Sequence, residues 1–289
     1  MDNALRLRAA ILSLALLLAL LAVWQIATSS GPAAKQVAMT PAQAEYAELM
    51  GMKSEAESGD AKVNGFPTPA QFFVVAAEQL RHPFYDNGPN DKGIGLQLAY
   101  SLGRVALGYL IAVLVAIPLG FAIGMSPLIY HAFAPFIQVL KPISPLAWMP
   151  IALYTIRDSS ISGIFVIFIC SIWPILINTA FGVAGVRKDW LNVAKTLEVG
   201  QFRKAFLVIL PAAAPTIITG MRISMGIAWL VIVAGEMLIG GTGIGYFVWN
   251  QWNNLSIANV IFAVLLIGLV GMTLDLLFGQ LQKAVTYAE

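Results

Sequence analysis

Apolar residues in this chain form long, uninterrupted runs rather than the short alternating patterns of soluble domains. A hydrocarbon core about 30 Å thick needs roughly 20 apolar residues of helix to cross it. Six stretches meet or approach that length: 9–27, 105–125, 132–156, 161–186, 212–239 and 257–274. The pattern predicts an all-α, polytopic membrane protein with about six transmembrane helices.

The first apolar run leaves two interpretations open. Arg6 and Arg8 precede it and small residues follow it at 28–30, as in a secretory signal. The run is longer than the apolar core of a usual signal. We therefore expect residues 1–29 to be a transmembrane anchor.

The distribution of lysine and arginine predicts the orientation. With a cytoplasmic N-terminus, the short cytoplasmic segments carry Arg6, Arg8, Arg187, Lys188, Lys195, Arg203, Lys204 and Lys283. The short outer loops then carry only Arg157. Because cytoplasmic loops are enriched in basic residues, both termini are expected in the cytoplasm.

The segment 30–98 is expected on the outer side by alternation of the spans. Its polar middle, residues 45–60, is typical of one short helix or a mobile segment. Residues 69–80 predict an amphipathic helix because apolar side chains recur there at helical spacing. That helix either packs on the protein surface or lies along the membrane. The remaining regions are a core at 99–282 and a cytoplasmic tail at 283–289.

Composition excludes several classes of protein. The chain is 58% hydrophobic and 11% charged, whereas soluble domains are about half apolar and a quarter charged. A net charge of +2 provides no basic surface for nucleic acid. The single cysteine, Cys170, excludes an internal disulfide, and neither histidine lies near a metal-ligand pattern. The glycine-rich residues 240–245 lack the Lys-Ser/Thr of a nucleotide loop, so they predict a tight turn and no cofactor site.

The polar loop 187–211 is the most informative segment. Asp189 is a predicted helix N-cap, and Gly200 is expected to end that helix. One face of the helix carries Trp190, Val193, Ala194 and Leu197, and the other carries Asn192, Lys195 and Thr196. A second helix follows until Leu210 and Pro211 lead into the fifth span. Two short helices of this kind either form a rigid knob for a soluble partner or lie on the membrane as a connector.

The order of residues in this loop resembles the EAA loop of permease subunits of ABC importers. The likeness rests on residues 192–197, followed at the right distance by Leu210 and Pro211. Further similar segments are 101–104, 141–150, 219–223 and 234–237, and the whole resemblance covers roughly residues 98–282. Together, these segments resemble the branch of ABC importer permeases that imports nitrate, bicarbonate, cyanate or sulfonates such as taurine. Residues 182–194 and 240–245 are most similar to nitrate permeases.

Two positions depart from the family pattern. Asn192 stands where the pattern usually has Glu, and Glu198 stands where it usually has Gly. Gly200 follows two positions after that site. The exact residues that contact an ATPase are therefore expected to differ from those of the usual pattern.

The resemblance implies a type I ABC importer permease fold and a mechanism. The coupling loop would comprise Asp189, Asn192, Val193, Ala194, Lys195, Thr196, Leu197, Glu198, Gly200, Leu210 and Pro211. It would fit a cleft on a cytoplasmic ATPase, whose ATP-driven closure moves two permease copies, a homodimer, between inward-open and outward-open states. A periplasmic binding protein would deliver the solute. The chain itself would be no enzyme and would bind no ATP, and it would lie in a bacterial inner membrane.

Ionisable and helix-breaking residues at membrane depth are candidates for the translocation pathway. Lys141 and Arg222 each lie roughly 14 Å deep at helical rise, and two cations suit an anion path. Alternatively, Arg222 pairs with Asp275, and Lys141 extends toward headgroups. Four prolines are expected to break the third span, so this span is expected to line the pathway, with Pro145 as a candidate residue. Met149 either shapes a gate or simply packs against its neighbours.

Glu236 is the last pathway candidate, because it is an ionisable residue of the fifth span, close to the end of that span at residue 239. It lies about 21 Å from Arg222 along the helix, so the two cannot pair within one copy.

The sequence therefore predicts a permease that imports a small anion, with nitrate favoured over nitrite, cyanate or bicarbonate. A sulfonate permease is the nearest alternative. A secondary transporter or channel driven by an ion gradient is an alternative of another class. That class predicts inverted halves and mid-membrane acidic residues for cation coupling, and the sequence shows neither.

Overall fold

The computed structural model describes residues 3–29, 66–88 and 91–285. Within these residues, every regular element is a helix except for an isolated bridge between Asp86 and Lys92. Five helices are long and apolar enough to cross a membrane, or six when one bent pair counts as a span. The predicted all-α, polytopic class is confirmed. The helix considered at 45–60 lies outside the described residues.

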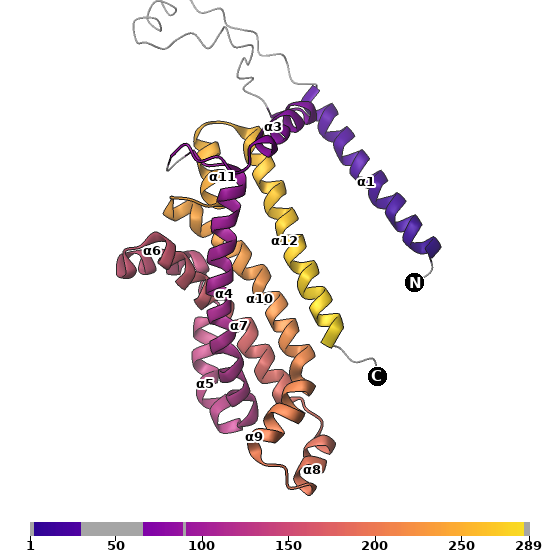
Figure 1. The fold of residues 1–289 in the computed structure, drawn as a ribbon, viewed down its shortest axis with the longest axis vertical. Helices are drawn as coiled ribbons and strands as arrows, with labels where there is room; N and C mark the ends of the chain where they lie inside the picture. The colour runs from indigo at the N-terminus through magenta and orange to yellow at the C-terminus, as the bar shows by residue number, and fades with distance from the viewer. Residues whose placement is uncertain (1–2, 30–65, 89–90, 286–289) are drawn as a thin grey trace, which may run out of the picture. The chain divides into compact units, whose positions relative to one another are not determined.

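Figure 1 shows the helices, which lie close to the predicted positions. They are α1 (Asn3–Ser29), α3 (Pro69–Arg81), α4 (Ile94–Met125), α5 (Pro127–Leu140), α6 (Pro145–Ile156), α7 (Ser159–Ala184), α8 (Lys188–Thr196), α9 (Gln201–Lys204), the π-helix η1 (Ala205–Ile209), α10 (Leu210–Ile239), α11 (Ile244–Asn253) and α12 (Ile257–Val285). The amphipathic helix expected at 69–80 is α3. Two helices cross the limits expected for the core at 99–282: α4 begins at Ile94, and α12 continues to Val285.

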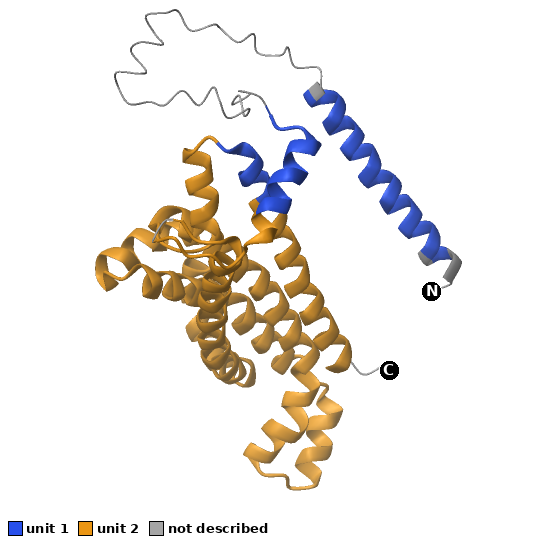
Figure 2. Ribbon diagram, turned by 45° about the horizontal axis from the view of Figure 1, so that its top comes forward, with its two compact units in different colours: residues 1–78, 256–262 blue, residues 79–255, 263–289 orange. Residues whose placement is uncertain are grey.

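The chain divides into two compact units, residues 1–78 with 256–262 and residues 79–255 with 263–289 (Figure 2). In the first unit, the Trp24 indole donates a hydrogen bond to the Pro67 carbonyl (2.9 Å), and its ring lies 5.7 Å from that of Phe72. These contacts join α1 to the start of α3. The leucines of α1 are largely exposed, as expected of a helix that meets lipid.

In the second unit, α4, α7 and α10 lie side by side (Figure 1). Small residues let the first two approach closely. A Cβ on Gly120 would collide with the Leu176 carbonyl, and one on Gly124 would collide with the Ala180 carbonyl. Lipid tails provide no hydrophobic force that drives helices together, so close backbone packing of this kind stabilises the pair.

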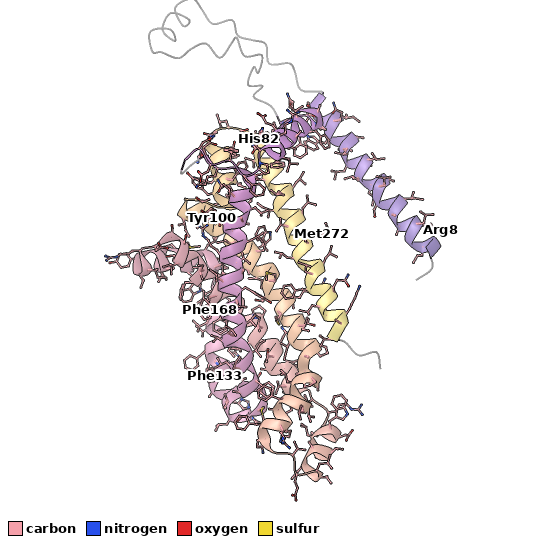
Figure 3. All side chains as sticks on the ribbon, in the orientation of Figure 1. Arg8, His82, Tyr100, Phe133, Phe168 and Met272 are labelled. Carbon is pink, nitrogen blue, oxygen red and sulfur yellow. The ribbon has the colours of Figure 1, made fainter. Side chains whose placement is uncertain are left out.

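Many outward-facing side chains of the long helices in this unit are apolar. Tyr100 of α4 and Met272 of α12 are about half exposed and project from the bundle (Figure 3). Exposed apolar surface on helices of spanning length is expected to contact lipid or a partner chain.

The third span is broken, as its prolines predict. The helices α5 and α6 meet at a bend of 91° across residues 141–144. Pro142 lies in the break and Pro145 starts α6, whereas Pro135 and Pro150 lie inside helices. Figure 1 shows α6 pointing away from the bundle. Backbone groups freed at membrane depth need shelter from protein or a watery cavity, so a partner or a pathway is expected at this bend.

The close packing of α4 on α7 predicts that alanine will have different effects on stability at two glycines of α4. We expect Gly120→Ala to lower stability by about 1–3 kcal/mol, because the added methyl group overpacks the interface. Gly103→Ala is the control, since a Cβ there meets nothing within 4 Å. That variant should be neutral or more stable, as Ala favours helix. Thermal unfolding of the two purified variants in detergent measures the difference, and equal melting temperatures would contradict the packing.

Candidate functional site

The coupling knob, residues 187–211, begins with α8. The helix starts at Lys188 with Arg187 at the N-cap position, where no side chain caps it. The prediction that Asp189 is the N-cap was wrong: Asp189 lies in the first turn. A carboxylate there interacts favourably with the helix dipole, and Asp189 also lies 3.6 Å from Arg187.

The turn of the knob lies at Glu198. The chain leaves α8 at Leu197, and Glu198 adopts a left-handed backbone with a φ of 53°. The Val199 amide donates to the Ala194 carbonyl and the Glu198 amide to the Lys195 carbonyl, both at 3.0 Å. This is a Schellman motif, which satisfies the last carbonyls of a helix. Glu198 thus adopts the conformation that usually requires the glycine of the family pattern.

The prediction that Gly200 ends the first helix was wrong. Gly200 is the N-cap of α9, with a φ of −57° that any residue can adopt. The helix ends earlier because the Schellman bonds at residues 198 and 199 already close it.

The second arm of the knob is continuous with the fifth span. Residues 201–239 form one stretch of 39 residues, made of α9, η1 and α10. The wider π turn of η1 precedes Pro211. A proline ring clashes with the carbonyl four residues earlier in an α-helix, here that of Leu207, and a π turn relieves such a conflict. Leu210 and Pro211 therefore mark the passage from knob to span.

The knob presents apolar side chains outward. Leu197 is 69% exposed and Phe202 is 84% exposed, and Trp190 and Val193 are also exposed. The predicted face is only partly correct, because Ala194 is turned inward and 3% exposed. Asn192, Lys195 and Thr196 are exposed too. The base of the knob packs on a cluster of buried apolar side chains. Leu191 and Leu210 contact this cluster, which consists of Val183, Val186, Ile209, Ala213 and Ile217.

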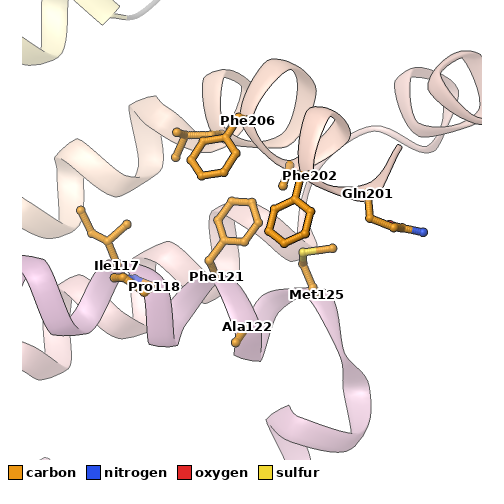
Figure 4. Close-up of a pocket in the computed structure, with 10 residues that line it drawn as sticks. Ile117, Pro118, Phe121, Ala122, Met125, Gln201, Phe202 and Phe206 are labelled. Carbon is orange, nitrogen blue, oxygen red and sulfur yellow. The ribbon is translucent and has the colours of Figure 1, made fainter. Parts of the chain in front are cut away.

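An apolar cavity of about 480 Å³ lies beside the second arm. Figure 4 shows Phe202 and Phe206 facing Phe121 across it, with Met125 of α4 at its edge. The exposed surface of the knob therefore continues into a hollow between α4 and η1.

Among the pathway candidates, Lys141 borders a second cavity of about 560 Å³ between α4, α5 and α7. Tyr130 and Gln138 also line this cavity. Lys141 is exposed, and among the described residues no carboxylate lies within ion-pair distance of it. Pro145 is half-buried at the start of α6. The cavity thus combines an ammonium, a phenol and an amide that can donate hydrogen bonds to an anion.

Arg222 forms the ion pair that the sequence offered as an alternative. Its guanidinium donates two hydrogen bonds of 2.6 Å to Asp275 of α12 and one of 3.3 Å to Gln282. The pair is exposed, so its contribution to stability is small, about 0–1 kcal/mol.

Met149 is buried, and in this conformation its side chain is not available to a passing solute. It is 1% exposed and packs into the notch left by Gly235, where a Cβ would collide with its terminal methyl group. This contact holds α6 against α10.

Glu236 is also buried, at 2% exposed. Arg104 of α4 donates to its carboxylate at 2.8 Å, and the Ser101 hydroxyl lies 2.7 Å from it. Removing one partner of a buried pair costs about 3–5 kcal/mol.

Sequence reasoning did not assign roles to Gln97, Ser101 and Arg104. One signal was available: Arg104 is the only basic residue of α4, and Glu236 is the only acidic residue of α10. A lone charge in an apolar helix usually has its partner on a neighbouring helix.

Comparisons with known proteins identify relatives of this chain. A family model described as a binding-protein-dependent transport system inner membrane component matches residues 98–287. The nitrate import permease protein NrtB of Synechocystis is 45% identical over 78% of this chain and 82% of its own length. The bicarbonate transport system permease protein CmpB of Synechocystis is 45% identical over 71% and 74%, and the taurine transport system permease protein TauC of Escherichia coli is 31% identical over 68% and 71%.

A solved structure has the same fold. A chain of the MetNI methionine ABC transporter in an inward-facing conformation aligns with a TM-score of 0.59, over 65% of this chain and 94% of that one. At 12% identity, the likeness concerns the fold alone.

The Schellman turn makes a prediction about which residue of the knob needs conformational freedom. We expect Glu198→Gly to stabilise the turn by up to about 1 kcal/mol, because glycine adopts positive φ without a steric penalty. Glu198→Val should destabilise it, and Gly200→Ala should have little effect, since a Cβ there meets nothing within 4 Å. Hydrogen exchange of the Val199 amide reports the opening of the turn. Faster exchange in Gly200→Ala than in Glu198→Val would place the turn at Gly200 instead.

Proposed function

Since this chain belongs to the family of inner membrane components of binding-protein-dependent transport systems, we propose that it is the permease of an ATP-driven importer for nitrate. The relatives named for nitrate and for bicarbonate are both 45% identical, and the taurine relative is 31% identical. Both of the first two solutes are small planar oxyanions. Bicarbonate is therefore the first alternative, and a sulfonate is the second.

The observation that carries this proposal is the exposed apolar surface of the coupling knob. Leu197 and Phe202 lie on either side of a hydrogen-bonded turn that extends beyond the helix bundle (Figure 1). Large exposed apolar side chains on a polar loop mark a protein interface. A cytoplasmic ATPase is the proposed partner, and it hydrolyses the ATP, so this chain is a transport subunit and no enzyme.

The continuity of residues 201–239 explains how such a partner would act. A push on Phe202 is applied directly to the first turn of a spanning helix. Because the α8 arm packs on the same buried cluster, the two arms move together. A flexible loop would absorb the displacement instead of transmitting it.

We place the knob and both termini in the cytoplasm, with the binding protein on the opposite side. The basic residues of the knob support this orientation, because such residues are retained on the cytoplasmic side. The bend between α5 and α6 supports a second permease copy. The two helices meet at 91°, and Tyr154 of α6 is 83% exposed. A second copy in a homodimer would cover this apolar surface.

Lys141 is the residue of the proposed pathway with the strongest support. It borders a cavity large enough for a small hydrated anion, and no described carboxylate lies within ion-pair distance of it. Pro145 and Met149 follow Lys141 in the sequence, on α6, and Met149 packs against α10 at Gly235. Arg222 already binds Asp275, so contact with an anion would require the pair to open.

The knob is tested by Leu197→Asp. A buried carboxylate at the interface should reduce ATPase activity stimulated by the binding protein by roughly tenfold or more, with normal insertion of the permease. Leu197→Met is the control, because it keeps an apolar side chain of similar volume at the same exposed position. Activity is measured on the reconstituted complex. Wild-type stimulation in Leu197→Asp would contradict docking at the knob.

The pathway is tested by Lys141→Met, which preserves length and removes the charge. Nitrate uptake per hydrolysed ATP should fall several-fold, whereas Lys141→Arg should retain most of it. Lys283→Met, at an exposed position in the last turn of α12, is the matched control for charge. Uptake in Lys141→Met equal to that of the wild type would remove Lys141 from the pathway.

A further inference from the structure

Glu236 lies at the end of α10 farthest from the knob, inside a polar cluster of the second unit. Its carboxylate lies 2.7 and 2.9 Å from the Ser101 hydroxyl, 2.8 Å from Arg104 Nη1 and 3.1 Å from the Gly245 amide. With 2% of the residue exposed, water cannot replace these partners. The side chain therefore depends entirely on α4 and on the start of α11.

The same cluster satisfies the first amides of α11. The Gly243 amide donates to the Gln97 side chain at 2.5 Å, and the Ile244 amide donates to Ser101 Oγ at 2.8 Å. The Gly245 amide donates to Glu236. The first amides of a helix have no partner within the helix, and a negative charge near them is favourable. Glu236 thus supplies the anion for the N-terminus of α11, and α4 supplies the remaining acceptors.

The glycine-rich residues 240–245 are shaped to receive this carboxylate. Gly243 has a φ of 152°, and a Cβ there would overlap the Glu236 carboxylate. A Cβ on Gly245 would overlap the Val233 carbonyl. The segment that resembles a phosphate loop in composition therefore encloses an anion that belongs to the chain itself.

Arg104 joins this cluster to two further elements. Its Nη1 also donates to the Thr242 carbonyl, and its Nη2 donates to Ser160 Oγ of α7 at 3.1 Å. One guanidinium thus connects α4, α7, α10 and the turn before α11. The cavity beside Arg104 and Glu236 measures about 10 Å³, room for a single water at most. A solute anion does not fit there while Glu236 is in place.

We infer that Glu236 is an internal anion that attaches the far end of the α10 rod to α4 and α11, so that displacement of the knob moves that end of the permease. Glu236 and Arg104 are then positioning residues of the transport cycle. Residues 201–236 span about 50 Å at helical rise, and they form one stretch with the exposed knob at the start and Glu236 near the end. This inference rests on the proposed function, because it assigns the knob to an ATPase.

The test uses three variants of the complete complex in proteoliposomes. Glu236→Ala removes a group of the size and charge of acetate. We expect solute moved per ATP to fall about tenfold or more, while ATP hydrolysis continues. Roughly 100 mM acetate should raise the solute moved per ATP by Glu236→Ala several-fold, because acetate can occupy the space that the carboxylate left. Glu236→Gln should be impaired without rescue, since its side chain still fills the space.

Asp275→Ala is the matched control, because it removes the carboxylate of the exposed Arg222 pair. Acetate should not rescue that variant. Failure of acetate to improve Glu236→Ala would overturn the internal anion. A fall of transport and ATP hydrolysis together, in proportion to folded complex, would overturn the role in coupling.

Thermal unfolding of the purified permease separates this inference from the proposed function. Acetate should raise the melting temperature of Glu236→Ala more than those of the wild type and Glu236→Gln. If the wild-type complex moved no nitrate while this rescue of stability was observed, the proposed function would fail and the internal anion would stand.

Discussion

One constraint shapes this protein: within lipid, the backbone must satisfy its own hydrogen bonds, and a helix that does so is a stiff rod. Residues 201–239 form one helical stretch of this kind, which includes the π turn η1 and Pro215, with the exposed Phe202 near one end and the buried Glu236 near the other. The neighbouring α7 packs closely on the rod, and α4 packs closely on α7 through Gly120 and Gly124. A displacement of the knob is therefore expected to move the far end of α10, at Glu236.

The same constraint made most of the fold predictable. Apolar runs of spanning length are local features, so the five long apolar helices and the broken third span were each anticipated, including the break at Pro142 and Pro145. The start of α4 was missed, since Gln97 and Ser101 are polar and reduce the apolar pattern. Their polarity is satisfied by α11 and Glu236, residues about 140 positions away, and local composition carries no information about such partners.

The candidate site shows where sequence reasoning stops. The identity of the loop followed from its residue order, but the position of the turn did not. The preference of glycine for positive φ amounts to about 1 kcal/mol, and the hydrogen bonds that close α8 outweigh it at Glu198. Helical periodicity likewise placed Ala194 with the apolar face, although it cannot tell which apolar residues pack on the chain itself and which remain for a partner.

The central claim is that this permease moves solute only when an ATPase drives it through the knob. The most direct measurement is nitrate uptake into proteoliposomes that contain the permease and binding protein, with and without the ATPase subunit and ATP. The account predicts concentrative uptake only when both the ATPase and ATP are present. Concentrative uptake by the permease without the ATPase, driven by an ion gradient, would contradict it.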